Sequence, residues 1–302
     1  EVTDIDTQVA VEALINEYTQ TEALKLLGQY LDKIVLMDHE EVKEGLANLV
    51  LKLDEKVAND ERIVTMDNFE FFRTEEEYLS SRAYLGISNK FDAEVGAYRE
   101  ELILIGGRRG SGKSIICSNI QTSQYEQGKV CPYFTIEMTA REVMERNMAI
   151  LSGVPHKNIR HRETTREEDE KLVFVRAQMF DNGLQFYESY LKHRDKQKFE
   201  TELLRHGELK QDAQLIIVDD RRMTLSTIDL HVSKLKAKHG DSLSVIVVDY
   251  VNQIAAAGRN SSMYAWIPQM EAAKGLKNLA RKHQVTVVSP YQIDASGEAR
   301  MA

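Results

Sequence analysis

One segment constrains this chain more than any other, because it fits the phosphate-binding pattern G-x-x-x-x-G-K-[ST]: Gly107, Arg108, Arg109, Gly110, Ser111, Gly112, Lys113 and Ser114. A short apolar run of strand length, 101–105, precedes the segment, and a helix candidate follows it and ends at Gly128. The glycines let the backbone curl so that successive N–H groups face a phosphate, at a helix N-terminus whose dipole also favours anions. The sequence therefore predicts a nucleoside triphosphate site, in which Lys113 reaches the β- and γ-phosphates and Ser114 holds Mg²⁺ through its hydroxyl.

Four more apolar runs of strand length follow, at 130–136, 215–219, 244–249 and 285–289. Segments with helical spacing lie between them, at 139–151, 172–179, 227–238 and 264–283. Strands that are almost wholly apolar and alternate with helices are typical of a parallel sheet covered by helices on both faces. We therefore predict an α/β fold, and we interpret the charged segment 188–212 as a surface helix or insertion with no chemistry of its own.

The first 60 residues differ from the rest of the chain in charge. They hold 14 acidic and 5 basic side chains, whereas residues 61–302 hold 34 of each. Apolar spacing predicts a helix over 7–37 and a second helix over 42–57 that is capped by Asp38. Two such helices bury little between themselves, so we expect them to pack on another copy, on a partner or on missing sequence. The plainer alternative is a helical hairpin on the surface of the nucleotide-binding part.

These differences predict three parts. An acidic helical region covers 1–60, a linker covers 61–85 and contains a helix from Glu75 to about Leu85, and the nucleotide-binding domain covers 86–302. The chain begins at Glu1 rather than at a methionine, so we expect a fragment of a longer protein.

Composition excludes several classes of protein. The net charge of −9 argues against a generally basic nucleic-acid-binding surface, although a channel with a locally basic lining is compatible with it. Every apolar run falls short of the ~20 residues that a membrane helix needs. The two cysteines give no disulfide framework and the eight histidines lack metal-ligand spacing, so we expect a cytoplasmic protein without a membrane anchor.

Polar side chains follow the predicted strands at the edge where ligands gather in open parallel sheets. Asp249 ends an aliphatic strand, which is the Walker B arrangement for orienting Mg²⁺, and Asp219 ends another strand and is the alternative. Glu137 follows the strand after the phosphate-loop helix, where a carboxylate can orient and deprotonate the water that attacks a γ-phosphate. Gln292 follows the last strand and could donate a hydrogen bond to the same phosphate group.

Four motifs, taken together and in this order, resemble the motor domain of DnaB-type replicative helicases: GGRRGSGKS at 106–114, YFTIEM at 133–138, IVVDY at 246–250 and VVSPYQ at 287–292. The resemblance covers about 80–302 and includes the segment YLGIS at 84–88. It implies a hexameric ring with a RecA-like core, ATP at the subunit interfaces, single-stranded DNA in the centre, and unwinding at the replication fork in the 5′-to-3′ direction. It also implies that Lys113 and Ser114 bind phosphate and Mg²⁺, that Asp249 is the Walker B carboxylate, that Glu137 is the catalytic base and that Gln292 senses the γ-phosphate.

The sequence departs from the family pattern in places. The two loops that the resemblance turns toward DNA, 255–263 and 293–300, offer only Arg259 and Arg300 as basic residues. The chain ends at Ala302, before the segment that carries the family's arginine finger. Residues 1–60 match no motif of the family, and a primase or a helicase loader is the partner expected there.

Three other functions are compatible with the phosphate loop. A recombinase of the RecA/RadA type or a KaiC-like ATPase shares the core, and the latter would favour a second carboxylate where Met138 stands. A P-loop kinase for a small molecule would need a lid rich in arginines. A nucleotide-gated scaffold would hydrolyse the nucleotide slowly.

Overall fold

A computed structural model of the chain describes residues 4–34, 37–38, 41–42, 45–46, 48–50, 52–53, 74–251, 254 and 266–293. The chain divides into two compact units, one made of residues 1–73 and 226–230 and the other of residues 74–225 and 231–302. None of the helices described has the length and apolar content of a membrane span.

The described residues of the first unit are mainly helical. Helix α1 covers Asp4–Ile34, so it both starts and ends three residues earlier than the predicted helix over 7–37. The described residues between 41 and 53 are also helical. The backbone N–H of Glu41 donates to the Asp38 Oδ1 atom at 2.9 Å, and the N–H of Asp38 donates back to the Glu41 carboxylate at 3.0 Å. Asp38 therefore caps this helical segment, as its sequence position predicted.

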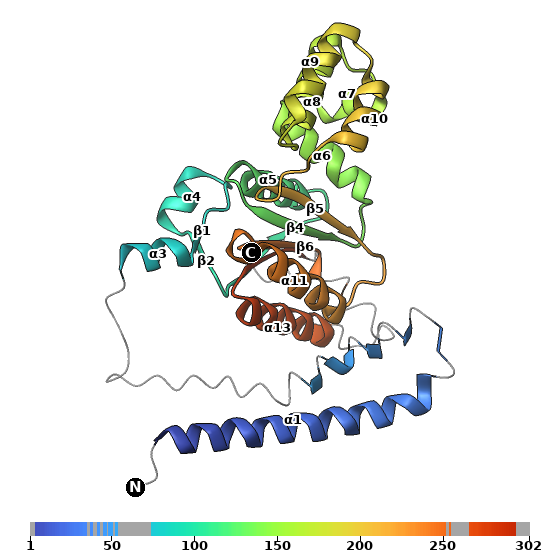
Figure 1. Cartoon of the computed structure of the whole chain (residues 1–302). Helices are drawn as coiled ribbons and strands as arrows, with labels where there is room; N and C mark the ends of the chain where they lie inside the picture. The colour runs from blue at the N-terminus through green and yellow to red at the C-terminus, as the bar shows by residue number, and fades with distance from the viewer. Residues whose placement is uncertain are drawn as a thin grey trace. The chain divides into compact units, whose positions relative to one another are not determined.

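The second unit is built on a five-stranded sheet in which every pair of neighbouring strands is parallel (Figure 1). Its strands, in spatial order, are β3 (Leu102–Gly107), β7 (Thr286–Gln292), β6 (Val245–Asp249), β4 (Val130–Thr135) and β5 (Gln214–Asp219). All five lie where the apolar runs predicted them, to within a few residues. The predicted α/β fold with a parallel sheet is therefore confirmed.

Helices cover both faces of this sheet (Figure 1). On one face, Cys117 and Ile120 of α5 (Lys113–Glu126) pack with Tyr133 of β4 and Val247 of β6 in one buried cluster. On the other face, the ring of Phe134 lies 6.3 Å from that of His231 in α11 (Leu225–His239). Helix α13 (Trp266–His283) contacts β3 and β7. The strands β4 and β6 are buried along their whole length, which explains why they are almost wholly apolar, whereas the edge strands β3 and β5 are only partly buried.

A group of short helices follows α6 (Ala140–Ser152), and Figure 1 shows them beyond the end of α6, away from the sheet. We call α7 to α10, residues 156–206, the helical projection. Its helices are α7 (His156–His161), α8 (Arg166–Gln178), α9 (Gly183–His193) and α10 (Lys196–His206). They share a core of their own, formed with the turn after α8 by Val173, Val175, Ala177, Met179, Phe180, Tyr190, Phe199 and Leu203. The charged segment 188–212 thus supplies the end of α9, which packs on α8, and the whole of α10, which packs on α9.

The helix predicted from Glu75 to about Leu85 is wrong in its second half. Helix α3 covers Glu75–Ser81, and the chain then becomes extended as β1 (Arg82–Ala83). Strand β1 pairs antiparallel with β2 (Ala97–Tyr98), beyond α4 (Asn89–Glu94). Ala83 and Leu85 are both fully buried, and this alternation needs an extended backbone because residues two apart share a face only in a strand.

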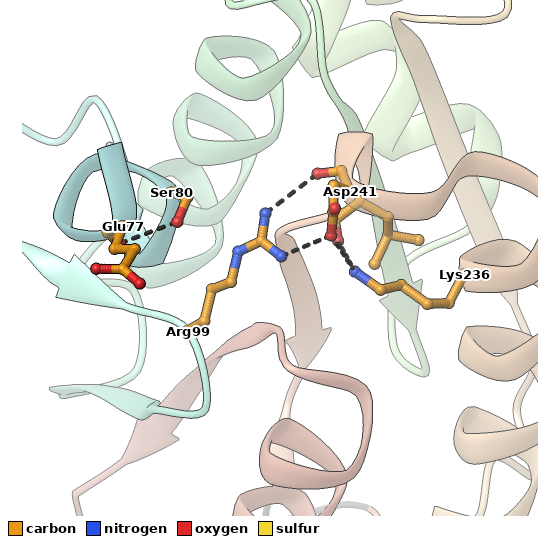
Figure 2. A network of polar contacts seen from close by, with 6 residues as sticks. Glu77, Ser80, Arg99, Lys236 and Asp241 are labelled. Atoms are coloured by element: carbon orange, nitrogen blue, oxygen red, sulfur yellow. Dashed lines mark hydrogen bonds and ion pairs between the residues drawn. The ribbon is translucent and has the colours of Figure 1, made fainter. Parts of the chain in front are cut away.

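A polar network ties the turn after β2 to the 3₁₀ turn Gly240–Ser242 that precedes β6 (Figure 2). The Arg99 guanidinium donates to the Asp241 carboxylate at 2.8 Å and to the Asp241 carbonyl at 3.4 Å. The Lys236 ammonium lies 3.3 Å from the same carboxylate. The hydrogen bond from Arg99 holds the pKa of Asp241 below its ordinary value. The Asp241 side chain is 84% exposed, so this network contributes little to stability.

Candidate nucleotide-binding site

The loop between β3 and α5 has the backbone that its glycines predicted. Gly110 and Gly112 have φ angles of +79° and +87°, the left-handed region that favours glycine. A Cβ atom on Gly107 would lie 2.5 Å from the Ser111 hydroxyl oxygen, so the first glycine permits a close approach within the loop. Gly112 is the N-cap of α5 and gives it no side-chain cap, so the first N–H groups of α5 have no capping side-chain acceptor. This loop fits a phosphate group.

Lys113 and Ser114 begin α5 at the mouth of the loop. The Lys113 ammonium donates to the carbonyl oxygens of Gly107 and Arg108, at 2.8 and 2.7 Å. The Ser114 side chain acts on the Asp249 carboxylate and lowers its pKa. The start of α5 and the end of β6 therefore bring two oxygen groups near each other at the loop.

Asp249 is the last residue of β6 and is only 4% exposed. The Tyr133 hydroxyl donates to its Oδ2 atom at 2.5 Å. Burial raises the pKa of Asp249, while the hydrogen bonds from Tyr133 and Ser114 and the charge of Arg146 act in the opposite direction. Burial of the Tyr133 hydroxyl, together with the Asp249 charge, raises the pKa of Tyr133 well above its ordinary value. The Asp249 carboxylate is thus buried beside the Tyr133 and Ser114 hydroxyl groups and near the positive charge of Arg146.

Glu137 and Gln292 reach the same edge of the sheet from β4 and β7. Glu137 lies two residues beyond the end of β4, and its charge is one of the factors that raise the pKa of Asp249. Gln292 ends β7 and is in register with Gly107 of β3. The parallel register therefore brings a residue of the last strand beside the start of the phosphate loop.

These side chains line one cleft of about 710 Å³, within the range of small-molecule sites. We call it the nucleotide cleft. Its walls are formed by Arg109, Gly110, Ser111, Gly112, Lys113, Ser114, Ile115, Glu137, Met138, Glu142, Arg146, Asp249, Tyr250, Pro290 and Gln292.

Some predicted site residues are not part of the cleft wall, and two are outside the residues that the structure describes. Gly107 and Arg108 belong to the loop and hold the Lys113 ammonium with their carbonyls, but they are not part of the cleft wall. Asp219, the alternative Walker B residue, is not part of the wall either, and it accepts a hydrogen bond from the backbone N–H of Ala140 at 2.8 Å. Arg259 and Arg300 lie outside the described residues.

Two residues that act at this site, Tyr133 and Arg146, carry little signal in the sequence. Tyr133 stands inside an apolar run and has the pattern of an ordinary core residue. Arg146 stands in α6 among other charged residues, and only the fold brings it to the cleft.

The residues present also fit a magnesium ion that arrives with a nucleotide. The Ser114 hydroxyl and the Asp249 carboxylate are hard oxygen ligands, which suit Mg²⁺. In the part of the chain that the structure describes, no group of three or more His, Cys, Asp or Glu side chains could hold a metal ion. A few protein oxygens beside a phosphate loop are the usual arrangement for Mg²⁺, which takes its other ligands from water and from the phosphates.

Residues 88–302 match the family described as the DnaB-like helicase C terminal domain. The chain belongs to this family. The match covers more than two thirds of the chain and includes every residue of the nucleotide cleft. Membership in the DnaB-like family implies that the chain uses a nucleotide.

Curated relatives of the DnaB-like chain are replicative helicases. It is 22% identical over 301 residues to a probable replicative DNA helicase of Trieres chinensis, which covers 96% of this chain and 58% of the relative. It is 24% identical over 206 residues to the replicative DNA helicase DnaB of Geobacillus stearothermophilus, covering 68% of this chain and 38% of the relative. The corresponding helicase of Pasteurella multocida is 24% identical over 220 residues, with coverages of 71% and 40%. The chain therefore spans about half the length of the curated relatives it matches.

Two solved structures share the fold. One is a DnaB-like replicative helicase described with its interactions with primase, with a TM-score of 0.58 and 15% identity over all of this chain and 63% of that one. The other is described as an ATPase domain, with a TM-score of 0.52 and 18% identity over 74% of this chain and 70% of that one. At these identities the likeness shows the fold.

Proposed function

We propose that this chain is the motor of an ATP-driven replicative DNA helicase. One observation carries the proposal: the phosphate loop, Asp249, Glu137 and Gln292 line a single cleft in a chain of the DnaB-like family. Each of these groups has a role in ATP hydrolysis, and each reaches the cleft from a different element of the sheet edge.

The chemistry divides among the residues of the cleft. The loop N–H groups and the Lys113 ammonium hold the phosphates, and Lys113 exchanges the carbonyls of Gly107 and Arg108 for phosphate oxygens. The Glu137 carboxylate orients a water molecule and takes its proton as the water oxygen attacks the γ-phosphorus and the bond to the β-phosphate oxygen breaks. Gln292 donates to the γ-phosphate and responds when that group leaves.

Mg²⁺ is the expected cofactor, and when bound it neutralises charge on the β- and γ-phosphates. Ser114 and Asp249 are the residues that would hold it. Both residues line the nucleotide cleft, and Ser114 acts on the pKa of Asp249, so both oxygen groups lie at the same end of the cleft before the nucleotide arrives.

We further propose that the protein works as a homo-oligomeric ring, a hexamer by the family resemblance, on single-stranded DNA. A head-to-tail interface that closes makes a ring, and each cleft is then completed by the neighbouring copy. The loops that contain Arg259 and Arg300 are the proposed DNA-facing segments. Residues 1–60 are the proposed site for a primase or a helicase loader. Free, buried Cys117 and Cys131 fit the reducing cytoplasm.

Family membership favours the helicase over the other functions that share a phosphate loop. A recombinase, a KaiC-like ATPase and a small-molecule kinase are each compatible with the cleft alone, and so is a slowly hydrolysing scaffold. Stimulation by nucleic acid separates the motor from the kinase and the scaffold.

The test is ATP hydrolysis by the full chain with and without single-stranded DNA at low salt. We expect single-stranded DNA to increase the turnover rate and added salt to weaken DNA binding, because DNA binding releases counterions. Lys113→Ala removes the ammonium from the loop, so we expect it to weaken nucleotide binding and abolish hydrolysis under both conditions. A parent turnover rate that no nucleic acid changes contradicts the motor and favours a kinase or a scaffold.

Light scattering tests the ring. We expect an oligomer that forms with an ATP analogue, and we expect deletion of residues 1–60 to weaken the assembly more than it weakens nucleotide binding. A chain that stays monomeric at micromolar concentration with the analogue and DNA present contradicts the ring.

A further inference from the structure

Arg146 lies in the middle of α6 and lines the nucleotide cleft together with the phosphate loop. Its positive charge acts on both Asp249 and Tyr133, which places the guanidinium near the end of the cleft where the Ser114 hydroxyl meets the Asp249 carboxylate. This is the end that the terminal phosphate and its metal ion would occupy. Arg146 had no role in the function proposed above.

The Nη1 atom of Arg146 is buried and has no hydrogen-bond partner among the residues that the structure describes. Buried side-chain nitrogen atoms almost always have a partner. A guanidinium carries five N–H donors and does not lose its proton in proteins, so it cannot avoid the need by becoming neutral. Of the described side-chain atoms that are buried without a partner, this is the one that belongs to the cleft wall.

The acidic residue at helical spacing from Arg146 is Glu142, and its carboxylate accepts hydrogen bonds from other residues. Glu142 stands four residues earlier, the spacing of a helical ion pair. One oxygen of its carboxylate accepts from the backbone N–H of Thr139 at 3.0 Å in a capping box, and the other accepts from Arg160 at 3.4 Å. On the same helix, Arg141 does pair with Glu145 at the same spacing, at 2.8 Å. Glu142 thus accepts from Thr139 and Arg160, and among the described residues the structure shows no hydrogen bond from Arg146 to it.

We propose that Arg146 donates a hydrogen bond from Nη1 to the terminal phosphate of the bound nucleotide, and that it thereby distinguishes a triphosphate from a diphosphate. The inference rests on the proposed function, because it needs a nucleotide in the cleft. An arginine is suited to the task, since hydrogen bonds between a guanidinium and phosphate oxygens are short and charge-assisted. The residue is supplied by the same copy of the chain that holds the phosphate loop.

The experiment measures the dissociation constants of a non-hydrolysable ATP analogue and of ADP, each with Mg²⁺, on the full chain by calorimetry. We expect Arg146→Ala to weaken binding of the analogue about tenfold or more and binding of ADP less than about twofold, because only the triphosphate carries the group that Arg146 contacts. Arg141→Ala, which removes a 70% exposed side chain of the same helix, is the matched control and should change neither constant by more than about twofold.

A merely structural role gives a different result. If Arg146 only balances the Asp249 charge, Arg146→Ala weakens both ligands alike, and that outcome overturns the proposal, as does unchanged binding of the analogue. Arg146→Gln, which keeps most of the side-chain volume, replaces the alanine variant if the latter does not fold. A parent chain that binds neither nucleotide overturns the proposed function itself, whereas a parent that binds both and an Arg146 variant that matches it overturn only this inference.

Discussion

The nucleotide cleft and the helical projection are both rich in charged side chains, but they use those charges differently. In the projection, charges are paired on the surface: Arg176 lies 2.9 Å from Glu200, and Lys196 lies 2.8 Å from Asp169. In the cleft, Lys113 is held by carbonyl oxygens, Asp249 is a buried carboxylate with a raised pKa, and the Nη1 atom of Arg146 lacks a partner among the described residues.

This difference indicates that the helical projection has a structural role, whereas the nucleotide cleft is a binding site. Surface ion pairs contribute little individually, so the projection depends for its stability on its apolar core. The cleft keeps a carboxylate whose burial raises its pKa and a guanidinium nitrogen without a partner among the described residues, and such arrangements reduce the stability of the free protein while they favour function. Changes in the cleft should therefore alter chemistry with little loss of stability, and changes in the projection should do the reverse.

The largest expected effect is on catalysis. Glu137→Gln should reduce ATP turnover by about 10²- to 10⁴-fold, because the amide cannot take a proton from the attacking water. Nucleotide binding should persist, since the phosphate loop is unchanged. Steady-state hydrolysis and calorimetric binding measure the two quantities. The control is Glu126→Gln at the exposed end of α5. Turnover at the parent rate would show that Glu137 is not the base.

The matching experiment in the projection should affect stability alone. Leu203 of α10 is fully buried in the projection core, so Leu203→Ala should reduce the free energy of unfolding by about 2–5 kcal/mol. Urea unfolding followed by circular dichroism measures this change. The neighbouring Leu204 is 65% exposed, and Leu204→Ala should stay within about 0.5 kcal/mol of the parent. Loss of nucleotide binding by folded Leu203→Ala protein would contradict the separation of the two regions.

Asp249→Asn should sharpen the contrast, because it should remove activity and increase stability. The raised pKa of Asp249 means that the folded chain disfavours the ionised carboxylate relative to the unfolded chain. An uncharged amide at this position should therefore raise the melting temperature at pH 7 without nucleotide, while ATP turnover is lost. Thermal unfolding in the presence of a chelator measures the shift. A lower melting temperature would show that the hydrogen bonds from Tyr133 and Ser114 outweigh the burial.

The smallest expected effect belongs to the exposed network around Asp241. The pKa of Asp241 is lowered, so its contribution to stability is present above the unfolded value of about 3.9 and is lost as the pH falls through the lower folded value. Asp241→Asn should therefore reduce stability at pH 7 by less than about 1 kcal/mol, and the difference from the parent should vanish in acid and shrink in high salt. Unfolding at several pH values measures it, with Asp212→Asn at another exposed position as the control.

The sheet was predictable from the sequence because its strands stand out as apolar runs, and its central strands β6 and β4 are buried on both faces. The phosphate loop was predictable for a related reason: only glycine adopts the backbone of Gly110 and Gly112 at little energetic cost. In both cases the residue types that the local backbone favours are also the ones that the folded structure requires: apolar residues in the strands and glycine in the loop. Family membership then followed from motifs that lie on these elements.

Other features depend on contacts between distant segments and were missed. Helix α3 ends at Ser81 because Ala83 and Leu85 reach a core that the local pattern does not reveal. The α9 and α10 helices are short, and α10 is highly charged, so the packing of α9 on α8 and of α10 on α9 was not anticipated from 188–212. In the sequence Tyr133 has the pattern of an ordinary core aromatic residue, and only the fold brings its hydroxyl to Asp249 at the end of β6.

The carbonyl oxygen of Gly107 accepts hydrogen bonds from two donors, the Lys113 ammonium at 2.8 Å and the backbone N–H of Ile293 at 3.2 Å. Ile293 is the first residue after β7, where the chain leaves the sheet. One carbonyl oxygen thus links the ammonium of the phosphate loop to the backbone that follows the last strand. On the mechanism proposed above, Lys113 leaves this oxygen for a phosphate, and the hydrogen bond from Ile293 stays. The binding of a nucleotide would then change the hydrogen bonding of the peptide group that the end of β7 contacts.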